Sequence, residues 1–199
     1  MEESVKILQH IENKYVDGKI LPLSQKHIEE IEFTWKPLLK NNNCWDKDLE
    51  FRKYLKEKPF LNFYVLEYNL VAQGVIVLYP NYESRLALGQ NIIYVNLLTV
   101  APWNRLDLKQ TPDYKGIGTT LITFAVIHSM NLGFEGRIGL HSVKESEYFY
   151  EKMNFINLGY DKNCCNLKYL ELPTDEAELL VLNHLLLCNL NNQLTIYGY

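Results

Sequence analysis

Two glycines separated by one residue, Gly116 and Gly118, stand at the start of a helical pattern that follows a strongly apolar strand pattern. The strand pattern covers residues 91–100, and the helical pattern runs to Leu132, where Gly133 is a typical stop signal. Glycines at a helix start leave successive backbone N–H groups accessible beside the positive end of the helix dipole. The turn therefore favours binding of a pyrophosphate, although a tight strand-to-helix connection without a ligand gives the same pattern.

The spacing around this turn excludes two better-known phosphate-binding motifs. The Rossmann fingerprint requires a third glycine and a short gap between strand and turn, and the Walker motif requires Gly-Lys-Ser/Thr after four spacer residues. Neither pattern is present. An ammonium group and two hydroxyls nevertheless accompany the glycines. The candidate phosphate-binding residues are Lys115, Gly116, Ile117, Gly118, Thr119 and Thr120.

Strand and helix patterns alternate along the chain. Strand patterns cover residues 60–68, 71–79, 91–100, 137–143, 155–160 and 166–172. Helical patterns cover residues 24–39, 46–55, 116–132, 145–153 and 174–188, with Ser24, Asp46 and Thr174 as predicted N-caps. Residues 1–20 also predict a helical arm, because Val5, Leu8, Ile11 and Tyr15 recur at near-helical spacing. This order implies a mixed sheet with helices on both faces, in the α/β or α+β class.

Length and charge narrow the classes of protein further. The 199 residues, 47% of them hydrophobic, suit one domain over 1–199 that ends in a helix and tail over 174–199. The net charge of -4 offers no broad cationic field to nucleic acid or to an anionic membrane. The most apolar stretch, residues 179–190, contains polar residues and is shorter than the ~20 needed to span a bilayer. It predicts a core helix and no membrane span.

The amino terminus and the cysteines favour the cytoplasm. Residues 1–4 are acidic, where a secretory leader would be basic and then apolar. The four cysteines, Cys44, Cys164, Cys165 and Cys188, form neither a disulfide framework nor the spacing of a zinc site. We therefore expect a reduced protein without a metal site.

Two further motifs, one before and one after the glycine turn, make the chain resemble a known family. Val100-Ala-Pro102 ends the strand before the turn, and Tyr150-Glu-Lys-Met-Asn154-Phe155 follows the next strand pattern. In this order the three motifs resemble the GCN5-related N-acetyltransferase (GNAT) superfamily over about residues 20–172, with the specific motifs within 95–160. Ala-Pro-Trp-Asn and Gly-Leu-His-Ser resemble an uncharacterised bacterial branch of it.

The resemblance implies a mostly antiparallel, mixed sheet with an acyl-coenzyme-A cleft between two splayed central strands. The glycine turn would hold the pyrophosphate, and the pantetheine arm would pair with the main chain of Leu98, Thr99 and Val100. Tyr150 would lie near the thioester sulfur and protonate the departing thiolate. The implied activity is direct transfer of an acetyl group from acetyl-CoA to a primary amine on a small molecule or peptide.

The chain departs from the family pattern at several positions. Asp113 stands where the family usually has Arg or Gln, so either Lys115 or Arg105 supplies the missing cation or the affinity for the cofactor falls. Asn154 replaces a glycine. The connection from Pro102 to the turn is long, and its residues 103–112 either cover the acceptor site or form a surface loop.

The general base and the exact function stay open at this stage. His141 is a candidate base, because its reference pKa of ~6.5 suits proton transfer near neutral pH, although a structural histidine would look the same. Two other classes fit the glycine turn: a non-catalytic acyl-CoA sensor or interaction domain, and a nucleotide-binding regulatory protein. A homodimer is also open. Several aromatic residues are candidates to line an acceptor cleft: Trp35, Trp45, Tyr64, Tyr79, Tyr82 and Trp103.

Overall fold

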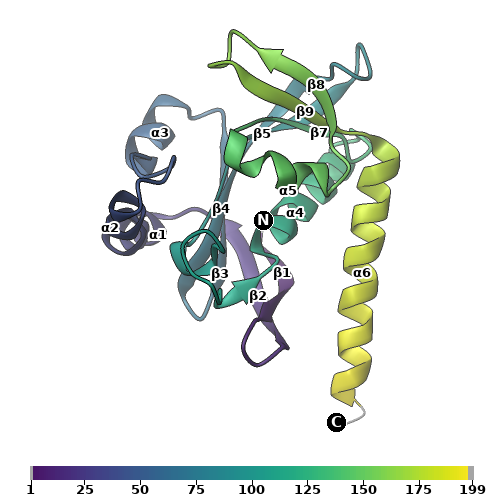
Figure 1. Ribbon diagram of the computed structural model, residues 1–199. Coiled ribbons are helices and arrows are strands. Elements are labelled where there is room, and N and C mark those ends of the chain that lie inside the picture. The colour runs from purple at the N-terminus through teal and green to yellow at the C-terminus, as the bar shows by residue number, and fades with distance from the viewer. Residues whose placement is uncertain (1, 197–199) are drawn as a thin grey trace. The chain divides into compact units, whose positions relative to one another are not determined.

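The computed structural model describes residues 2–196, of which 187–196 are described by their backbone alone (Figure 1). The chain forms two compact units, and each is described by itself. Unit 1 comprises Met1–Val77 and Leu97–Leu121, and unit 2 comprises Leu78–Asn96 and Ile122–Tyr199. None of the helices described is both long enough and apolar enough to cross a membrane.

Nine strands and several helices make up the described part of the chain. The strands are β1 (Glu3–Gln9), β2 (Lys14–Pro22), β3 (Asn62–Tyr68), β4 (Val71–Glu83), β5 (Asn91–Val100), β6 (Tyr114–Lys115), β7 (Ile138–Ser142), β8 (Ile156–Asp161) and β9 (Leu167–Leu172). The α-helices are α1 (Gln25–Glu30), α2 (Lys36–Asn41), α3 (Phe51–Glu57), α4 (Ile117–Asn131), α5 (Glu147–Glu151) and α6 (Thr174–Ile196). A π-helix, η1 (Ile31–Trp35), and two 3-10 turns, η2 (Pro102–Asn104) and η3 (Lys144–Ser146), complete them.

The strand order is β6-β1-β2-β3-β4-β5-β7-β9-β8. β5 pairs with β7 in parallel, whereas β1 with β2, β1 with β6, β2 with β3, β7 with β9 and β8 with β9 are antiparallel. The predicted fold class, a mixed and mostly antiparallel sheet flanked by helices, is confirmed.

The amino-terminal segment of unit 1 corrects one prediction. Residues 1–20 do not form a helical arm, because β1 and β2 form an antiparallel hairpin there. Val5 and Ile7, two residues apart, are 5% and 1% exposed, whereas Ile11 is 78% exposed in the turn between the strands. The period that governs burial is therefore two, and the near-helical spacing of the apolar residues is a coincidence.

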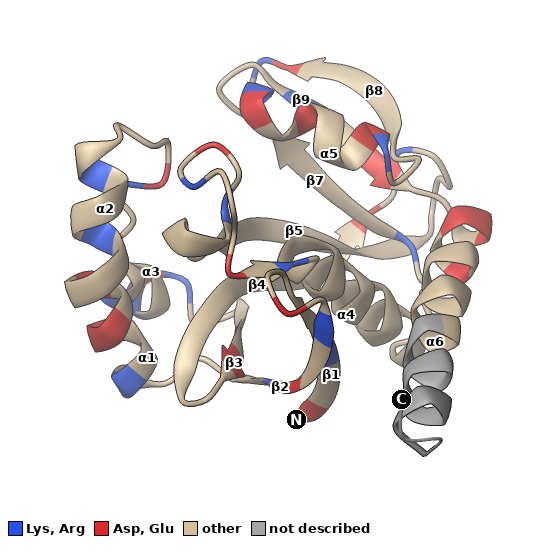
Figure 2. Ribbon diagram, turned by 60° about the horizontal axis from the view of Figure 1, so that its bottom comes forward, with Lys and Arg blue, Asp and Glu red and all other residues tan. Residues whose placement is uncertain are grey.

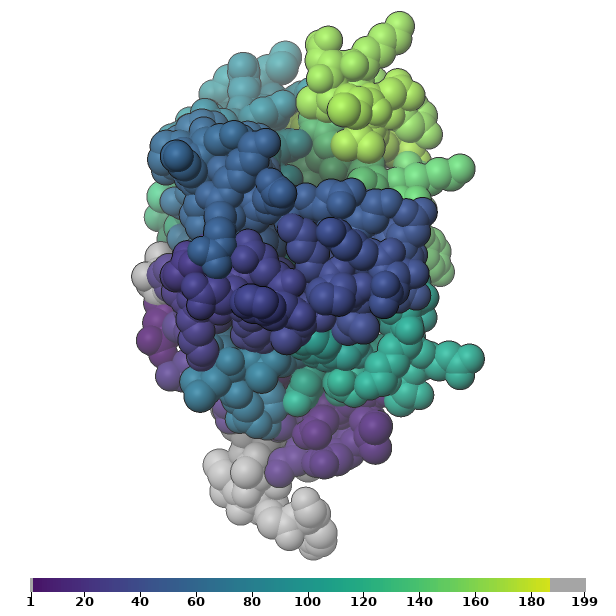
Figure 3. Space-filling model, turned by 90° about the vertical axis from the view of Figure 1, so that its left-hand side faces the viewer, coloured from purple at the N-terminus to yellow at the C-terminus, as the bar shows by residue number. Residues whose placement is uncertain are grey.

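The helical part of unit 1 follows the prediction with one exception. The predicted helix over 24–39 is present as α1, η1 and α2, and the Ser24 N–H donates to His27 Nδ1 at 3.1 Å at its start. Asp46, however, does not cap a helix. α3 begins only after Glu50, and the Asp46 side chain is buried. Figure 3 shows the face of unit 1 that α1, α2 and α3 form.

The strands before the glycine turn agree closely with their predicted ranges. β3 and β5 lie where expected, and β4 runs on to Glu83, so that the following loop is shorter than predicted. β6 was not predicted. It pairs Lys115 with Leu8 and Tyr114 with Gln9, which ties the residues before the glycine turn to the amino-terminal hairpin.

Unit 2 contains the later predicted elements at nearly their expected positions. β7, α5, β8 and β9 all fall within the predicted ranges to within a few residues. α6 starts at Thr174 as predicted but continues to Ile196 rather than ending near Cys188, whose side chain lies outside the described residues. Figure 2 shows acidic and basic residues scattered over many elements, so neither sign of charge is gathered on one of them.

Candidate functional site

The end of β5 carries the main chain that is expected to contact pantetheine. Leu97 and Thr99 are buried and Leu98 and Val100 are half-buried, which is the alternation of a strand with two different faces. The ladder between β5 and β7 joins Ile93–Val95 to Ile138–Leu140. Leu98, Thr99 and Val100 therefore lie beyond the part of β5 that pairs with β7.

The glycine turn begins helix α4. Gly116 has a φ of 79°, in the left-handed region that favours glycine, and a Cβ placed on it would have no atom within 4 Å. The Thr120 N–H donates to the Gly116 carbonyl at 2.8 Å and makes the first intrahelical bond. The N–H groups of Ile117 and Gly118 precede that bond and have no acceptor within the helix. The turn thus offers backbone donors beside open space, which suits an anion.

A third glycine holds the start of α4 against the strands. A Cβ on Gly74 in β4 would lie 2.8 Å from Ile117 Cγ2, 2.9 Å from Leu121 Cδ1 and 3.3 Å from the Thr99 carbonyl oxygen. A side chain at Gly74 would therefore displace the first turn of α4. The sequence alone gave no reason to single this glycine out, because the contact joins residues far apart in the chain.

The side chains of the turn differ in accessibility. Lys115 and Thr119 are exposed, whereas Thr120 is only 7% exposed. One ammonium group and one hydroxyl of the predicted set are therefore accessible. Asp113, at the position where a cation was expected, pairs with Lys109 at 2.5 Å.

A buried ion pair lies beside β5. Asp46, with a side chain 0% exposed, accepts hydrogen bonds from Arg105 Nη1 at 3.1 and 3.2 Å and from Thr99 Oγ1 at 2.5 Å. Arg105 also pairs with Asp107 at 2.9 Å. Arg105 is thus engaged with carboxylates, and Lys115 is the cation that remains next to the turn. The Thr99 side chain is likewise engaged, so only its main chain is a candidate for contact with a cofactor.

The insertion over 103–112 is anchored at its base. Trp103 Nε1 donates to Gln73 Oε1 at 3.0 Å, and Asn104 Nδ2 donates to the same oxygen at 2.8 Å. Asn104 Oδ1 accepts the Tyr114 N–H at 3.0 Å. Leu106, further along the insertion, is 72% exposed. The insertion therefore combines a fixed base with an exposed tip.

A small pocket opens in unit 1 next to this ion pair. Its lining consists of Ile31, Glu32, Trp35, Lys36, Leu39, Asp46, Leu49, Phe51 and Thr99. Trp35 packs edge-on against Trp103, with ring centroids 6.1 Å apart. The buried Trp35 Nε1 has no hydrogen-bond partner among the described residues. Since buried donors are normally satisfied, this N–H suits a water molecule held in the pocket.

Tyr150, the predicted acid, belongs to unit 2. It lies in α5, is 6% exposed, and packs edge-on against Phe155 at 5.3 Å between ring centroids. Burial raises the pKa of the Tyr150 phenol well above its ordinary value. The phenol therefore keeps its proton throughout the physiological pH range.

His141, the predicted base, also belongs to unit 2, on β7. Its Nδ1 lies 2.7 Å from Tyr94 Oη, and its Nε2 lies 3.3 Å from Asp161 Oδ2. Burial lowers the pKa of His141, and the Asp161 carboxylate partly opposes that effect. Both ring nitrogens are thus engaged by side chains that the sequence did not single out, since these partners lie on other strands.

Comparison with known proteins places the fold. No protein-family model matches the chain, and no curated protein matches it in sequence. Among solved structures, a mutant of the AtaT toxin bound to the C-terminus of the antitoxin AtaR and acetyl-CoA has a TM-score of 0.55 and 16% identity, covering 82% of this chain and 97% of that one.

Two further solved structures are similar. The Bacillus subtilis N-acetyltransferase YlbP in complex with coenzyme A has a TM-score of 0.52 and 18% identity, covering 88% of this chain and 98% of that one. FeeM, an N-acyl amino acid synthase from uncultured soil microbes, has a TM-score of 0.55 and 13% identity, covering 83% of this chain and 93% of that one. The chain therefore has the fold of the GNAT acetyltransferases, as its motifs indicated.

Proposed function

We propose that the protein is an N-acyltransferase that moves an acetyl group from acetyl-CoA to a primary amine. The observation that carries the proposal is the glycine turn, with Gly116 at φ 79° and the N–H groups of Ile117 and Gly118 ahead of the first bond of α4. Two proteins of similar fold bind acetyl-CoA or coenzyme A, which supports the same cofactor here.

In this proposal the cofactor is held mainly by backbone groups. The N–H groups of Ile117 and Gly118 bind the pyrophosphate, with Lys115 and Thr119 as accessible side-chain partners. Pantetheine pairs with the main chain of residues 98–100, beyond the part of β5 that pairs with β7. Thr120 contributes no side-chain contact, because it is buried.

The chemistry is direct attack of a neutral amine on the thioester carbonyl. A carbon–nitrogen bond forms, the carbon–sulfur bond breaks, and the departing thiolate takes a proton from the Tyr150 hydroxyl. The raised pKa of Tyr150 keeps that proton in place until the thiolate forms, although it also reduces the driving force for the transfer. The oxyanion is stabilised by a main-chain N–H near Val100.

We assign His141 no part in proton abstraction. Tyr94 and Asp161 engage its two ring nitrogens, so it would accept an amine proton only by way of the Tyr94 hydroxyl. An amine that binds as the free base, or gives its proton to water, requires no base from the chain.

The pocket beside Asp46 has room for about one water molecule and is lined by Lys36 as well as by Glu32 and Asp46, so we place no acceptor in it. We treat the two units as parts of one acyltransferase domain over 1–199. The free cysteines Cys44, Cys164 and Cys165 are consistent with a reducing compartment such as the cytoplasm.

Ligand-dependent thermal unfolding separates the candidate functions. Acetyl-CoA and coenzyme A are expected to raise the melting temperature, and to raise it further as their concentration increases. ATP and NAD are expected to have little effect. Preference for ATP or NAD would contradict the proposal and favour a nucleotide-binding regulator. Thiol release from acetyl-CoA with a panel of amines then separates an enzyme from an acyl-CoA sensor, which would bind without turnover.

A further inference from the structure

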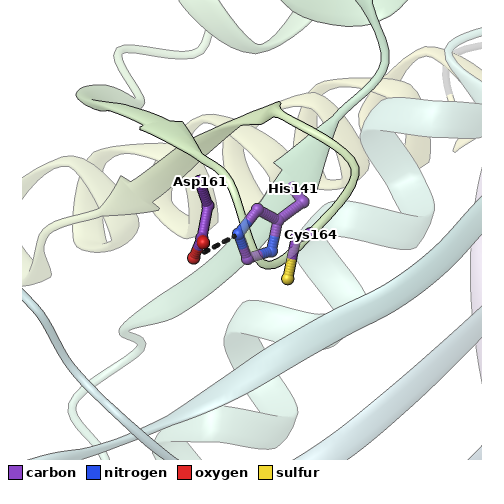
Figure 4. Close-up of side chains that lie close together, drawn as sticks. All are labelled: His141, Asp161 and Cys164. Carbon is purple, nitrogen blue, oxygen red and sulfur yellow. Dashed lines mark hydrogen bonds and ion pairs between the residues drawn. The ribbon is translucent and has the colours of Figure 1, made fainter.

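Three side chains that the proposed acyl transfer does not use meet in unit 2. His141 lies on β7, Asp161 ends β8, and Cys164 lies in the turn between β8 and β9. One ligand atom of each lies within 4.8 Å of the other two, and Figure 4 shows the carboxylate and the sulfur close to the imidazole ring. This is the one such group of three found among the described residues.

We propose that His141, Asp161 and Cys164 bind a zinc ion, with water at a fourth position. Imidazole nitrogen, carboxylate oxygen and thiolate sulfur are all zinc ligands, and three protein ligands with one open position are a common arrangement. Magnesium and calcium prefer oxygen ligands alone, so a set with nitrogen and sulfur favours zinc over them. Binding converts the Cys164 thiol to a thiolate and releases its proton to solvent.

The spacing of the ligand atoms fits such a site closely. Zinc–nitrogen and zinc–oxygen bonds of about 2.0–2.1 Å at a tetrahedral angle place the two atoms about 3.3 Å apart. His141 Nε2 and Asp161 Oδ2 are 3.3 Å apart. The sulfur would need to lie about 3.6 Å from either atom. One ligand atom of each residue lies within 4.8 Å of the other two, so the Cys164 side chain has to turn toward the pair and approach it by about 1 Å or more.

The turn between β8 and β9 already holds two of the ligands together. The Cys164 N–H donates to the Asp161 carbonyl oxygen at 3.1 Å, and the Leu167 N–H donates to the Cys164 carbonyl at 2.9 Å. Cys164 is half-buried, so its side chain can adjust without repacking the core. Closure of the site therefore needs a side-chain movement within an existing turn.

Hydrogen bonds outside the cluster orient its ligands. With Nε2 on the metal, His141 Nδ1–H donates to Tyr94 Oη, 2.7 Å away, which is the second hydrogen bond that metal-binding histidines usually make. Asp161 Oδ1 accepts the Asn163 N–H at 2.9 Å. Arg85, 2.5 Å from Asp161 Oδ2, opposes a cation by its charge, but the two anionic ligands neutralise the zinc ion and leave Arg85 as a partner of the carboxylate.

Cobalt binding tests the proposal without an assay of acyl transfer. The purified protein is freed of metal with a chelator, titrated with Co²⁺, and followed by its thiolate-to-cobalt charge-transfer absorption, with Zn²⁺ as the competitor. We expect one cobalt per chain, displaced by zinc, and no such absorption in Cys164→Ser. Cys165→Ser is the matched control, because it removes the neighbouring, exposed thiol and leaves the three ligands in place.

Three further variants sharpen the test. His141→Gln and Asp161→Asn are each expected to weaken binding strongly, and Tyr94→Phe, which removes the hydroxyl that contacts Nδ1, is expected to weaken it about 10–100-fold. The proposal is overturned by absence of the absorption in the parent protein, by its persistence in Cys164→Ser, or by its equal loss in Cys165→Ser. Circular dichroism of the metal-free variants checks that they fold. If a variant of a strand residue does not fold, the result for Cys164→Ser decides between the outcomes.

Discussion

Loss of Arg105 is expected to leave a buried carboxylate without its cation. The Asp46 side chain is 0% exposed and receives two hydrogen bonds from Arg105, so Arg105→Ala leaves it the hydrogen bond from Thr99. Breaking a buried pair in this way typically costs about 3–5 kcal/mol. For a chain of this size, that corresponds to a fall of about 6–20 °C in melting temperature.

Two comparison variants make the measurement specific. Lys109→Ala breaks the exposed pair with Asp113, in the same insertion, and should cost about 0.2–1 kcal/mol. The double variant Asp46→Asn with Arg105→Ala removes both charges and should recover part of the loss. Denaturant unfolding at neutral pH gives the free energies. A cost for Arg105→Ala no larger than that for Lys109→Ala would refute the view that the buried Asp46 carboxylate depends on Arg105 as its counter-ion.

Three further predictions follow from the site. Tyr150→Phe should lower thiol release by about 10²–10⁴-fold with acetyl-CoA affinity unchanged, and full activity would reject Tyr150 as the acid. Gly116→Ala should cost about 1–2 kcal/mol in denaturant unfolding, because φ is 79° there, and a neutral effect would show that the turn tolerates a side chain. In metal-free protein, the NMR titration midpoint of His141 should lie below the ordinary histidine value and fall further in Asp161→Asn, because Asp161 raises this pKa. Since the unfolded chain then binds the proton more readily, His141 should make the protein less stable as pH falls through the ordinary histidine pKa, and a midpoint above that value would contradict this.

The helices and strands predicted most accurately from the sequence are those in which a single periodic pattern determines the structure. β5 and α4 carry long apolar patterns joined by a glycine turn, and both lie where expected. The amino-terminal hairpin was missed because Val5, Leu8 and Ile11 imitate helical spacing, whereas burial follows Val5 and Ile7. Short segments of this kind fit both periods, and the tertiary contacts choose between them.

The surroundings of the candidate site were harder to predict, because they depend on contacts between distant residues. Asp46 and Arg105 are 59 positions apart, and each alone looks like a surface charge or a helix cap. The zinc ligands proposed here follow no known sequence spacing, and His141 gave no sign of its partners Tyr94 and Asp161. Such pairs become visible only when the strand order is known.

The proposed function depends on the binding of acetyl-CoA at the start of α4, and calorimetric titration of acetyl-CoA measures that binding. Gly118→Asp adds a carboxylate at the N–H groups assigned to the pyrophosphate, whereas Asn131→Asp adds the same charge at the exposed last residue of the helix. We expect the parent protein and Asn131→Asp to bind acetyl-CoA alike and a folded Gly118→Asp to bind it at least tenfold more weakly, a difference of about 1.4 kcal/mol. Equal affinity in all three proteins would contradict the proposal.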